Sequence, residues 1–450
     1  MSESYRVVDV FTPTTPAKLT FVERSDVNDQ LVDAIRTPGK QIVVYGHTGS
    51  GKTTLLRNKL EQLYGDWIKS SCTIDTTLDS LILEAFDHLN VYFVDGKSNS
   101  QTRSITTSLK ADYTILKSSI SAKLTSGMSS DEKRFVPPQL TPQRLAHFMG
   151  TAGCAWVIDD FHKVRETEKV RLAQTMKVFM DAAGDFNELK VIMIGAVGTA
   201  REVIEYDAEM QNRVTEVHVP LMGPDELREI ADRGETLLNV EFGRHFKDSV
   251  AQYSSGLASI YHQLCLNACF AADINSTQPD RVQLTSEHMT KAISRYLADS
   301  SDTLKRAFQL ALRQKKSSKW DNCKSIVQTL SSFGGEGATH HQLLEKLLAL
   351  HDDYPSGNLT HFLKQLQSVD RGELIRLDRN SLHYSFTNPI YHSYAKLIDH
   401  KPRPSTKQRL LFDQSTEVRK IIEKALEALK EADRLVVGAG QGEESGGSSP

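Results

Sequence analysis

Short apolar runs separated by helical periodicity dominate the first half of the chain. The runs lack the polar alternation of a half-exposed strand, which predicts buried strands over residues 42–45, 154–158 and 189–195 and a shorter one over 68–74. Apolar residues three and four positions apart predict helices over residues 27–36, 52–64, 78–89 and 170–180. Thr141 and Pro142 have the form of a further helix start. Buried strands that alternate with helices indicate an α/β fold with a parallel sheet covered on both faces, here assigned to residues 41–222.

Helical periodicity dominates the second half of the chain. Residues 224–297 are expected to be helical throughout, which predicts a helical subdomain over residues 223–318. A third unit begins near Trp320, with helices over residues 322–333, 339–348 and 357–369. Thr339 is the expected cap of the second of these helices. Two strands within residues 374–386, joined by a turn at 378–381, then complete the elements of a winged helix over residues 319–400.

Four other segments depart from these patterns. The lead-in, residues 1–40, includes an extended stretch over residues 11–16 that we expect to run over the surface. Residues 97–138 are rich in Ser, Thr and Lys and predict an inserted, partly helical arm. Its basic side chains either contact a nucleic acid or acidic partner, or form a solvated surface excursion. Residues 401–437 predict a charged amphipathic helix that packs back or pairs with another protein, and residues 438–450 a disordered tail.

Composition narrows the class of protein. The chain has 450 residues, 39% of them hydrophobic and 25% charged, with a net charge of -3. This balance argues against a protein that coats nucleic acid through bulk charge, although a local basic patch remains open. Neither a membrane-spanning apolar run nor a signal-peptide core occurs, so we expect a cytoplasmic protein without membrane contact. The five cysteines are odd in number and lack metal-ligand spacing, which favours buried free thiols over a zinc site.

The strongest motif, QIVVYGHTGSGKTT, covers residues 41–54. It is a G-x-x-x-x-G-K-[ST] loop with a strand before it and a helix after it, the context that a phosphate-binding P-loop requires; a chance glycine-rich turn is the alternative. The glycines let backbone N–H groups approach phosphate oxygens, and the helix N-terminus favours an anion. Lys52 is the expected charge on the β- and γ-phosphates of ATP, and Thr53 a magnesium ligand. The remaining predicted nucleotide contacts within the loop are Gly46, His47, Thr48, Gly49, Ser50, Gly51 and Thr54.

A second candidate site follows the apolar run that ends in Asp159 and Asp160. In a parallel sheet these acids would lie at the same edge as the P-loop. We expect Asp159 to orient Mg²⁺ and Asp160 to polarise the attacking water. The alternative is that the pair caps the turn after the strand, as Asp often does.

Together these stretches resemble the AAA+ branch of P-loop ATPases, over about residues 19–398. Within it, the chain is most similar to origin-recognition-type initiator ATPases and to the signalling ATPases called STAND proteins. The resemblance implies that the segment with Phe21 and Val22 lies against adenine. It also implies that residues 189–195 are the sensor strand, with Thr199 the nearest polar candidate after it.

Two later positions gain meaning only from this resemblance. Residues 211–220 resemble the segment that carries an arginine finger into a neighbouring subunit, and Arg213 is the residue transferred, with a surface salt bridge as the alternative. Residues 253–260 resemble the start of the helical lid, where many members place an arginine on the γ-phosphate. Here Ser259 stands at that place, a departure shared with STAND proteins, although Ala258 replaces their proline. This favours a slow nucleotide switch over a continuously cycling motor.

The winged helix leaves the partner open. Its third helix offers Asn358, Thr360, His361 and Lys364 to a DNA groove, and the wing region offers Arg371, Arg376 and Arg379. This is thin for phosphate neutralisation, and winged helices also serve as protein-binding modules. Trp320, Tyr391 and Tyr394 are expected in the core. We therefore carry three hypotheses: a DNA-associated initiator or loader ATPase, a STAND-like switch in bacterial defence or mobile-element systems that oligomerises or engages a protein effector, and an ATP-gated scaffold with negligible turnover.

Overall fold

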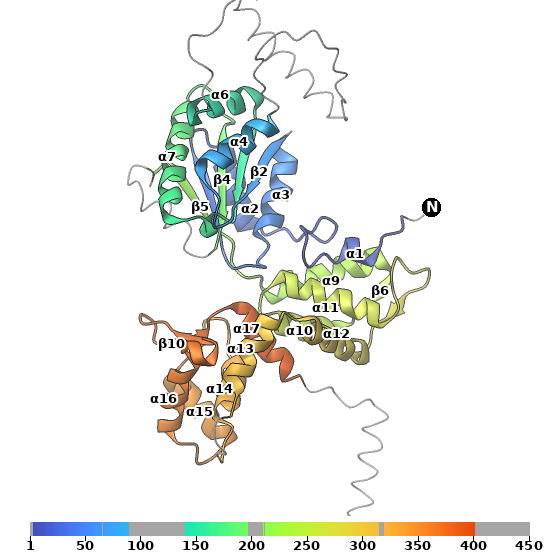
Figure 1. Ribbon diagram of the computed structural model, residues 1–450. Coiled ribbons are helices and arrows are strands. Elements are labelled where there is room, and N and C mark those ends of the chain that lie inside the picture. The colour runs from blue at the N-terminus through green and yellow to red at the C-terminus, as the bar shows by residue number, and fades with distance from the viewer. Residues whose placement is uncertain are drawn as a thin grey trace, which may run out of the picture. The chain divides into compact units, whose positions relative to one another are not determined.

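The computed structural model describes residues 3–64, 66–89, 140–196, 210, 212–314 and 319–400 (Figure 1). The described residues up to Asp399 form one compact unit. The predictions for residues 97–138, 401–437 and 438–450 lie outside the described residues, and so does Thr199.

A five-stranded parallel sheet forms the first part of the unit. Its strands are β1 (Gln41–Tyr45), β2 (Trp67–Ser71), β3 (Ala155–Asp159), β4 (Lys190–Gly195) and β5 (Val214–His218), in the order β2-β3-β4-β1-β5. The four strands predicted from apolar runs are present. Strand β5 was not predicted as a strand. It lies at the sheet edge, where Val214 and Val217 are buried and Glu216 and His218 are exposed, so it lacks the continuous apolar run of a central strand.

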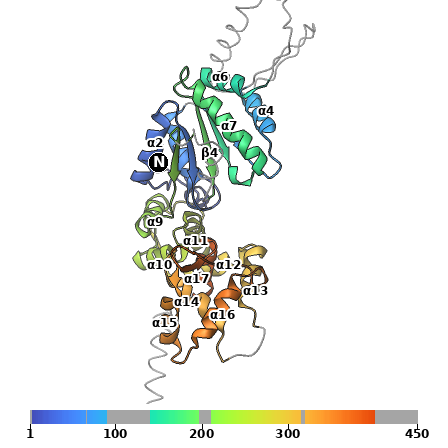
Figure 2. The same ribbon diagram turned by 90° about the vertical axis from the view of Figure 1, so that its left-hand side faces the viewer.

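Helices cover both faces of this sheet, as predicted. Helices α2 (Ser25–Arg36) and α3 (Lys52–Leu63) pack against Ile42, Val44 and Ile192. Helices α4 (Leu78–His88), α6 (Pro142–Ala152) and α7 (Glu166–Ala182) pack on the opposite face, around Trp156, so that α2 and α7 lie on opposite sides of the sheet (Figure 2). Thr141 caps α6, as expected, by accepting the N–H of Arg144 at 3.3 Å.

The helical subdomain that follows the sheet is called the lid from here on. It contains α9 (Pro224–Leu238), α10 (Arg244–Ser254), α11 (Ala258–Ala271) and α12 (Ser286–Asp299). The expectation of helix throughout residues 224–297 was wrong, because β6 (Val240–Glu241) and β7 (Val282–Gln283) pair as a small parallel sheet. Asn239, in the left-handed conformation with φ 54°, ends α9 and turns the chain into β6. Strands of two residues are too short to leave a period in the sequence.

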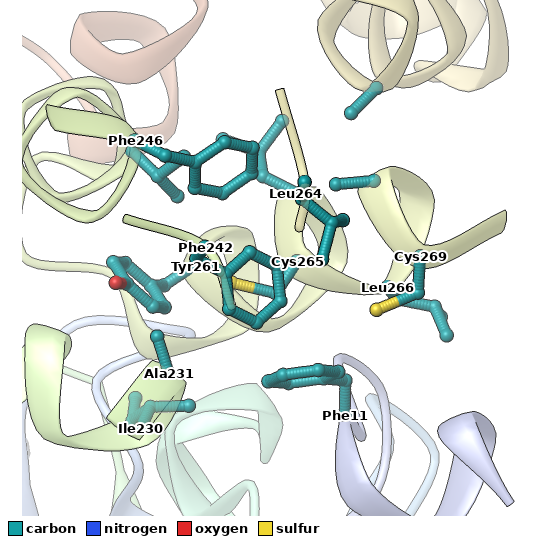
Figure 3. Packing of buried hydrophobic residues seen from close by; sticks show 14 of the residues in the cluster. Phe11, Ile230, Ala231, Phe242, Phe246, Tyr261, Leu264, Cys265, Leu266 and Cys269 are labelled. Atoms are coloured by element: carbon teal, nitrogen blue, oxygen red, sulfur yellow. The ribbon is translucent and has the colours of Figure 1, made fainter. Parts of the chain in front are cut away.

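Part of the lead-in belongs to the lid core rather than to the surface. Val7 and Val10 of helix α1 (Val7–Val10) and Phe11 are buried in the lid cluster, so the expected surface course of residues 11–16 was wrong at its first residue. The Phe11 ring meets the Phe242 ring edge-on, with centroids 5.8 Å apart, among the residues that Figure 3 shows. A Cβ added at Gly234 would lie 2.3 Å from the Phe11 ring, so the absence of a side chain there gives Phe11 its place.

The part of the chain assigned to residues 319–400, called the C-terminal unit from here on, has the elements expected of a winged helix. Their order is α14 (Asn322–Ser331), β8 (Ala338–Thr339), α15 (His340–Leu350), α16 (Ser356–Leu366), β9 (Ile375–Leu377), β10 (His383–Phe386) and α17 (Pro389–Ile398). Thr339 caps α15 in a capping box with Gln342, as predicted. Helix α13 (Asp302–Leu312) falls in the segment assigned to the helical subdomain, but its Leu304, Phe308 and Ala311 lie in the core of this unit. Tyr394 is buried there, and Trp320 and Tyr391 pack against the same core, which confirms their expected structural place.

Lys190, at the start of β4, is a buried cation that is held by backbone carbonyls. Its Nζ donates to the carbonyl oxygens of Thr37 and Lys40, and burial lowers its pKa to about 8. The unfolded chain therefore binds more protons than the folded chain between about pH 8 and pH 10.5, and the free energy of unfolding rises with pH across this window.

We expect Lys190→Met to lose this rise, by up to about 3 kcal/mol, because one pKa unit corresponds to about 1.4 kcal/mol. Urea denaturation of both proteins at the two ends of the window measures the effect. Parallel pH profiles for wild type and variant would assign the pH dependence to other groups.

Candidate nucleotide-binding site

The P-loop connects the end of β1 to the start of α3. Gly46, Gly49 and Gly51 all have positive φ angles, and two of these glycines allow a close approach. A Cβ at Gly46 would lie 2.3 Å from the Val219 carbonyl oxygen, and one at Gly49 would lie 2.5 Å from Ser259 Oγ. Glycine at these positions therefore lets the loop touch Val219, which follows β5, on one side and Ser259 of the lid on the other.

Lys52 lies at the first turn of α3 and points back along the loop. Its Nζ donates to the carbonyl oxygens of Gly46, at 2.9 Å, and of His47, at 2.8 Å. Burial lowers the pKa of Lys52, and the negative charges of Asp159 and Asp160 oppose that shift. Burial also lowers the pKa of His47, with smaller contributions from the positive charges of Arg376 and Lys52. Lys52 and Arg376 thus bring positive charge near His47 of the loop, where an anion would bind.

The paired acids lie at the carboxyl end of β3, and lysines hold both of them. Asp159 Oδ2 lies 2.8 Å from Lys69 Nζ, and its Oδ1 accepts the backbone N–H of Asp160 at 2.9 Å. Asp160 has φ 59°, and its Oδ2 lies 2.6 Å from Lys163 Nζ. The side chain of Asp159 is 15% exposed and that of Asp160 42%, so the first acid is the more enclosed of the two.

A cavity of about 670 Å³ brings most of the predicted residues together, although Gly46 and His47 are not among those that line it. Its walls include Thr48 to Thr54 of the P-loop, both acids, and Phe21 and Val22 of the lead-in. Thr53, with its hydroxyl, and Asp159, with its carboxylate, both line this cavity. They are the hard oxygen donors that Mg²⁺ prefers, so this pair fits a magnesium ion.

The cavity also contains residues that the sequence reasoning missed. Lys69 of β2, Thr12 of the lead-in and His262 of α11 all line it. Lys69 is the charged residue within the strand predicted over residues 68–74, which is a weak signal. Thr12 and His262 are 250 positions apart and carry no shared signal in the sequence. Ser259, which the sequence did single out, lines the cavity beside Ala258.

Arg213 is not among the residues that line this cavity. It lies just before β5, and its Nη1 is 2.9 Å from Asp181 Oδ1 of α7. Its side chain is 39% exposed and that of Asp181 63%. The surface salt bridge considered for Arg213 is therefore present, and within its own chain the arginine stands apart from the P-loop.

Comparison with known proteins places the sheet core in a family. Residues 35–204 match the family described as "AAA domain". No curated protein matches the sequence. None of the helices in the described ranges combines the length and the apolar character needed to cross a lipid bilayer.

Several solved structures are similar to the chain at low identity. The Walker-type ATPase PABY2304 of Pyrococcus abyssi is 15% identical to this chain and has a TM-score of 0.45. The match covers 84% of this chain and 96% of that protein. Cdc6p of Pyrobaculum aerophilum is 16% identical, with coverages of 88% and 99% and a TM-score of 0.42. The ORC1 protein of Aeropyrum pernix, in complex with DNA, is 14% identical, with coverages of 88% and 97% and a TM-score of 0.39.

These TM-scores are low, so the assignment depends on the family match and on the site. The matched segment contains β1, the P-loop, the paired acids of β3 and the strand β4 between them in the sheet. Proteins with AAA domains bind ATP, generally with Mg²⁺. Residues 35–204 therefore match an AAA domain, and this part of the chain has the P-loop and the paired acids of an ATPase.

Proposed function

We propose that this chain binds ATP with Mg²⁺, hydrolyses it slowly and uses the nucleotide to switch conformation or assembly. The observation that carries the proposal is the single cavity that joins the P-loop, the paired acids and the lid helix α11. A nucleotide in this cavity would touch the sheet core and the lid at once. Its binding and loss would therefore change how the two are held together.

The residues take distinct roles in this proposal. The backbone N–H groups of residues 46–51 and the ammonium of Lys52 bind the β- and γ-phosphates. Thr53 and Asp159 hold Mg²⁺, which when bound supplies positive charge at the phosphates. Asp160 orients a water and accepts its proton as the water attacks the γ-phosphorus, while the bond from that phosphorus to the bridging oxygen breaks and ADP leaves. Phe21 and Val22, which line the cavity, take the place against the base.

Slow turnover is proposed because, in the described part of the lid, a neutral serine rather than an arginine lies against the P-loop. Ser259, at the position where the resemblance implies an arginine, touches the P-loop close to Gly49. A neutral hydroxyl stabilises the charge that develops on the γ-phosphate less than a guanidinium does. The lid contact is thus suited to sensing the nucleotide rather than to accelerating its hydrolysis.

A second copy of the chain would supply the missing charge. Arg213 and Asp181 form an exposed pair, which is worth about 0–1 kcal/mol and is easily exchanged for a phosphate contact. We propose that Arg213 acts as an arginine finger in a homo-oligomer. Assembly and hydrolysis would then depend on one another.

Fewer basic residues are exposed for contact with DNA than the sequence suggested, which weakens the DNA-associated alternative. Arg371 was counted as part of the wing's basic surface, but it is 4% exposed and donates to the carbonyl oxygens of Ala311 and Arg313 at the end of α13. It closes the end of a helix and is withheld from DNA. Arg376 and Arg379 remain, together with Lys364 of α16, so we keep the alternative in second place.

The test is the steady-state ATPase rate per subunit over a range of protein concentrations, with and without duplex DNA. We expect the rate to rise with protein concentration, Arg213→Ala to remove that rise, and Asp181→Ala to keep it. Asp181→Ala is the matched control, because it breaks the same ion pair and leaves Arg213 in place. A concentration-dependent rise in Arg213→Ala would refute the finger, and stimulation by DNA would move the alternative into first place.

A further inference from the structure

Two polar groups meet at the end of the cavity formed by the lead-in and the lid. His262 of α11 is 4% exposed, and its Nδ1 accepts the backbone N–H of Thr12 at 3.2 Å. Within the described part of the chain, Thr12 Oγ1 is buried and has no hydrogen-bond partner. Both residues line the cavity. A buried hydroxyl without a partner is costly unless a ligand satisfies it, which points to a bound group at this place.

The hydrogen bond from Thr12 determines what His262 has to offer. Burial lowers the pKa of His262 to about 4, so the ring is neutral near pH 7. Since Nδ1 accepts the Thr12 N–H, the ring proton lies on Nε2. The ring also packs edge-on against Phe11, with centroids 6.2 Å apart, which restricts its orientation. The His262 ring is thus held in place with a hydrogen-bond donor at Nε2, while its one acceptor, Nδ1, is already occupied by Thr12.

The surrounding walls suit a flat, mostly apolar ligand. Val22, Met222 and Ile230 line the cavity and belong to the same apolar cluster as Phe11. Lys52 and the acids, which suit phosphates and Mg²⁺, belong to the P-loop and to β3 instead. The donor of His262 and the hydroxyl of Thr12 are therefore placed with the apolar walls of the cavity.

We propose that Thr12 and His262 read the edge of the adenine base, with His262 Nε2–H donating to a ring nitrogen and the Thr12 hydroxyl accepting from the amino group. This rests on the proposed ATP-binding function and adds its base specificity. On its Watson–Crick edge, adenine places the ring acceptor N1 beside the amino donor N6, whereas guanine places the N1–H donor beside the acceptor O6. The Nε2–H donor of His262 matches N1 of adenine and would meet the N1–H donor of guanine, while the Thr12 hydroxyl can either accept or donate.

The same pair couples the base to the lid. Thr12 belongs to the lead-in and His262 to the lid helix that also carries Ser259, which touches the P-loop. A base held by both residues adds a contact to α11 at one end, while Ser259 lies at the phosphate end. Adenine recognition would thereby stabilise the lid in the position that the P-loop contact requires.

The experiment is a calorimetric titration of the full chain with ATP, GTP and inorganic tripolyphosphate. His262→Asn is the test variant, because the asparagine Oδ1 replaces the Nδ1 acceptor for Thr12, whereas the shorter asparagine amide does not reach the position of Nε2. We expect ATP affinity to fall about tenfold, the loss of one hydrogen bond. The preference for ATP over GTP should shrink by the same factor and tripolyphosphate affinity should stay unchanged. Thr12→Val should also lower ATP affinity, and Thr12→Ser, which keeps the hydroxyl, should not.

His392→Asn is the matched control for the loss of a buried imidazole. His392 is also 4% exposed with a pKa lowered to about 4, but it lies in α17 and is not among the residues that line the cavity. We expect it to leave the ATP to GTP ratio unchanged. An unchanged ratio in His262→Asn, or an equal loss of ATP and tripolyphosphate, would overturn the base-reading pair. Failure of the wild type to bind all three probes would instead overturn the proposed function.

Discussion

Replacing Lys52 by alanine is expected to abolish measurable ATP binding, a loss of at least about a hundredfold. A hydrogen bond to a charged group contributes about 1.5–3 kcal/mol, and Lys52 would make such bonds to two phosphates in a half-enclosed cavity. Its Nζ already lies at the loop, 2.9 Å and 2.8 Å from two carbonyl oxygens. Little rearrangement is then needed for it to meet a phosphate.

Calorimetric titration with ATP measures this loss, and thermal unfolding checks that the loop has not collapsed. Lys52→Met belongs in the same series, because it keeps the aliphatic stem and removes only the charge. Arg36→Ala, at the exposed end of α2, removes a cation that does not line the cavity and should bind ATP as the wild type does. Unchanged ATP affinity in Lys52→Ala would place the nucleotide elsewhere.

The sheet core could be predicted because its signals are local. A central parallel strand is buried on both faces, so each of β1, β3 and β4 appears in the sequence as an unbroken apolar run. The P-loop is a single stretch whose glycines, lysine and threonine act together within one turn. Parallel topology then brings Asp159 and Asp160 to the same cavity as Lys52, which the order of elements alone implies.

The remainder of the site could not be predicted because it depends on contacts between distant residues. Lys69 meets Asp159 only because β2 and β3 are neighbours in the sheet. Two other contacts join segments more than 200 positions apart in the sequence. They are the contact between Phe11 and Gly234 and the hydrogen bond between Thr12 and His262. Two further errors arose because burial differed from what residue type suggests. Strand β5 has a polar pattern because one of its sides is exposed, and Arg371 was expected at the surface because arginine is usually exposed.

Asp160→Asn is expected to keep ATP binding and to lose turnover by at least about a hundredfold, since a positioned general base contributes roughly 10²–10⁴ in rate. Asparagine has nearly the same shape but no charge, so it cannot accept the proton of the attacking water. The backbone of residue 160 has φ 59°, a conformation that asparagine tolerates well, and the fold should therefore be preserved. The variant separates the chemical step from binding.

The control for this variant is Lys163→Met. The substitution at Asp160 also breaks its ion pair with Lys163, and the lysine variant breaks that pair while leaving the carboxylate. Steady-state turnover and calorimetric ATP titration are measured on both. If Lys163→Met loses turnover as severely as Asp160→Asn, the ion pair rather than the carboxylate carries the effect. If Asp160→Asn retains hydrolysis, the base lies elsewhere. Asp159, which is more enclosed and bound to Lys69, would then be the group to examine, because it is the other acid within the same cavity.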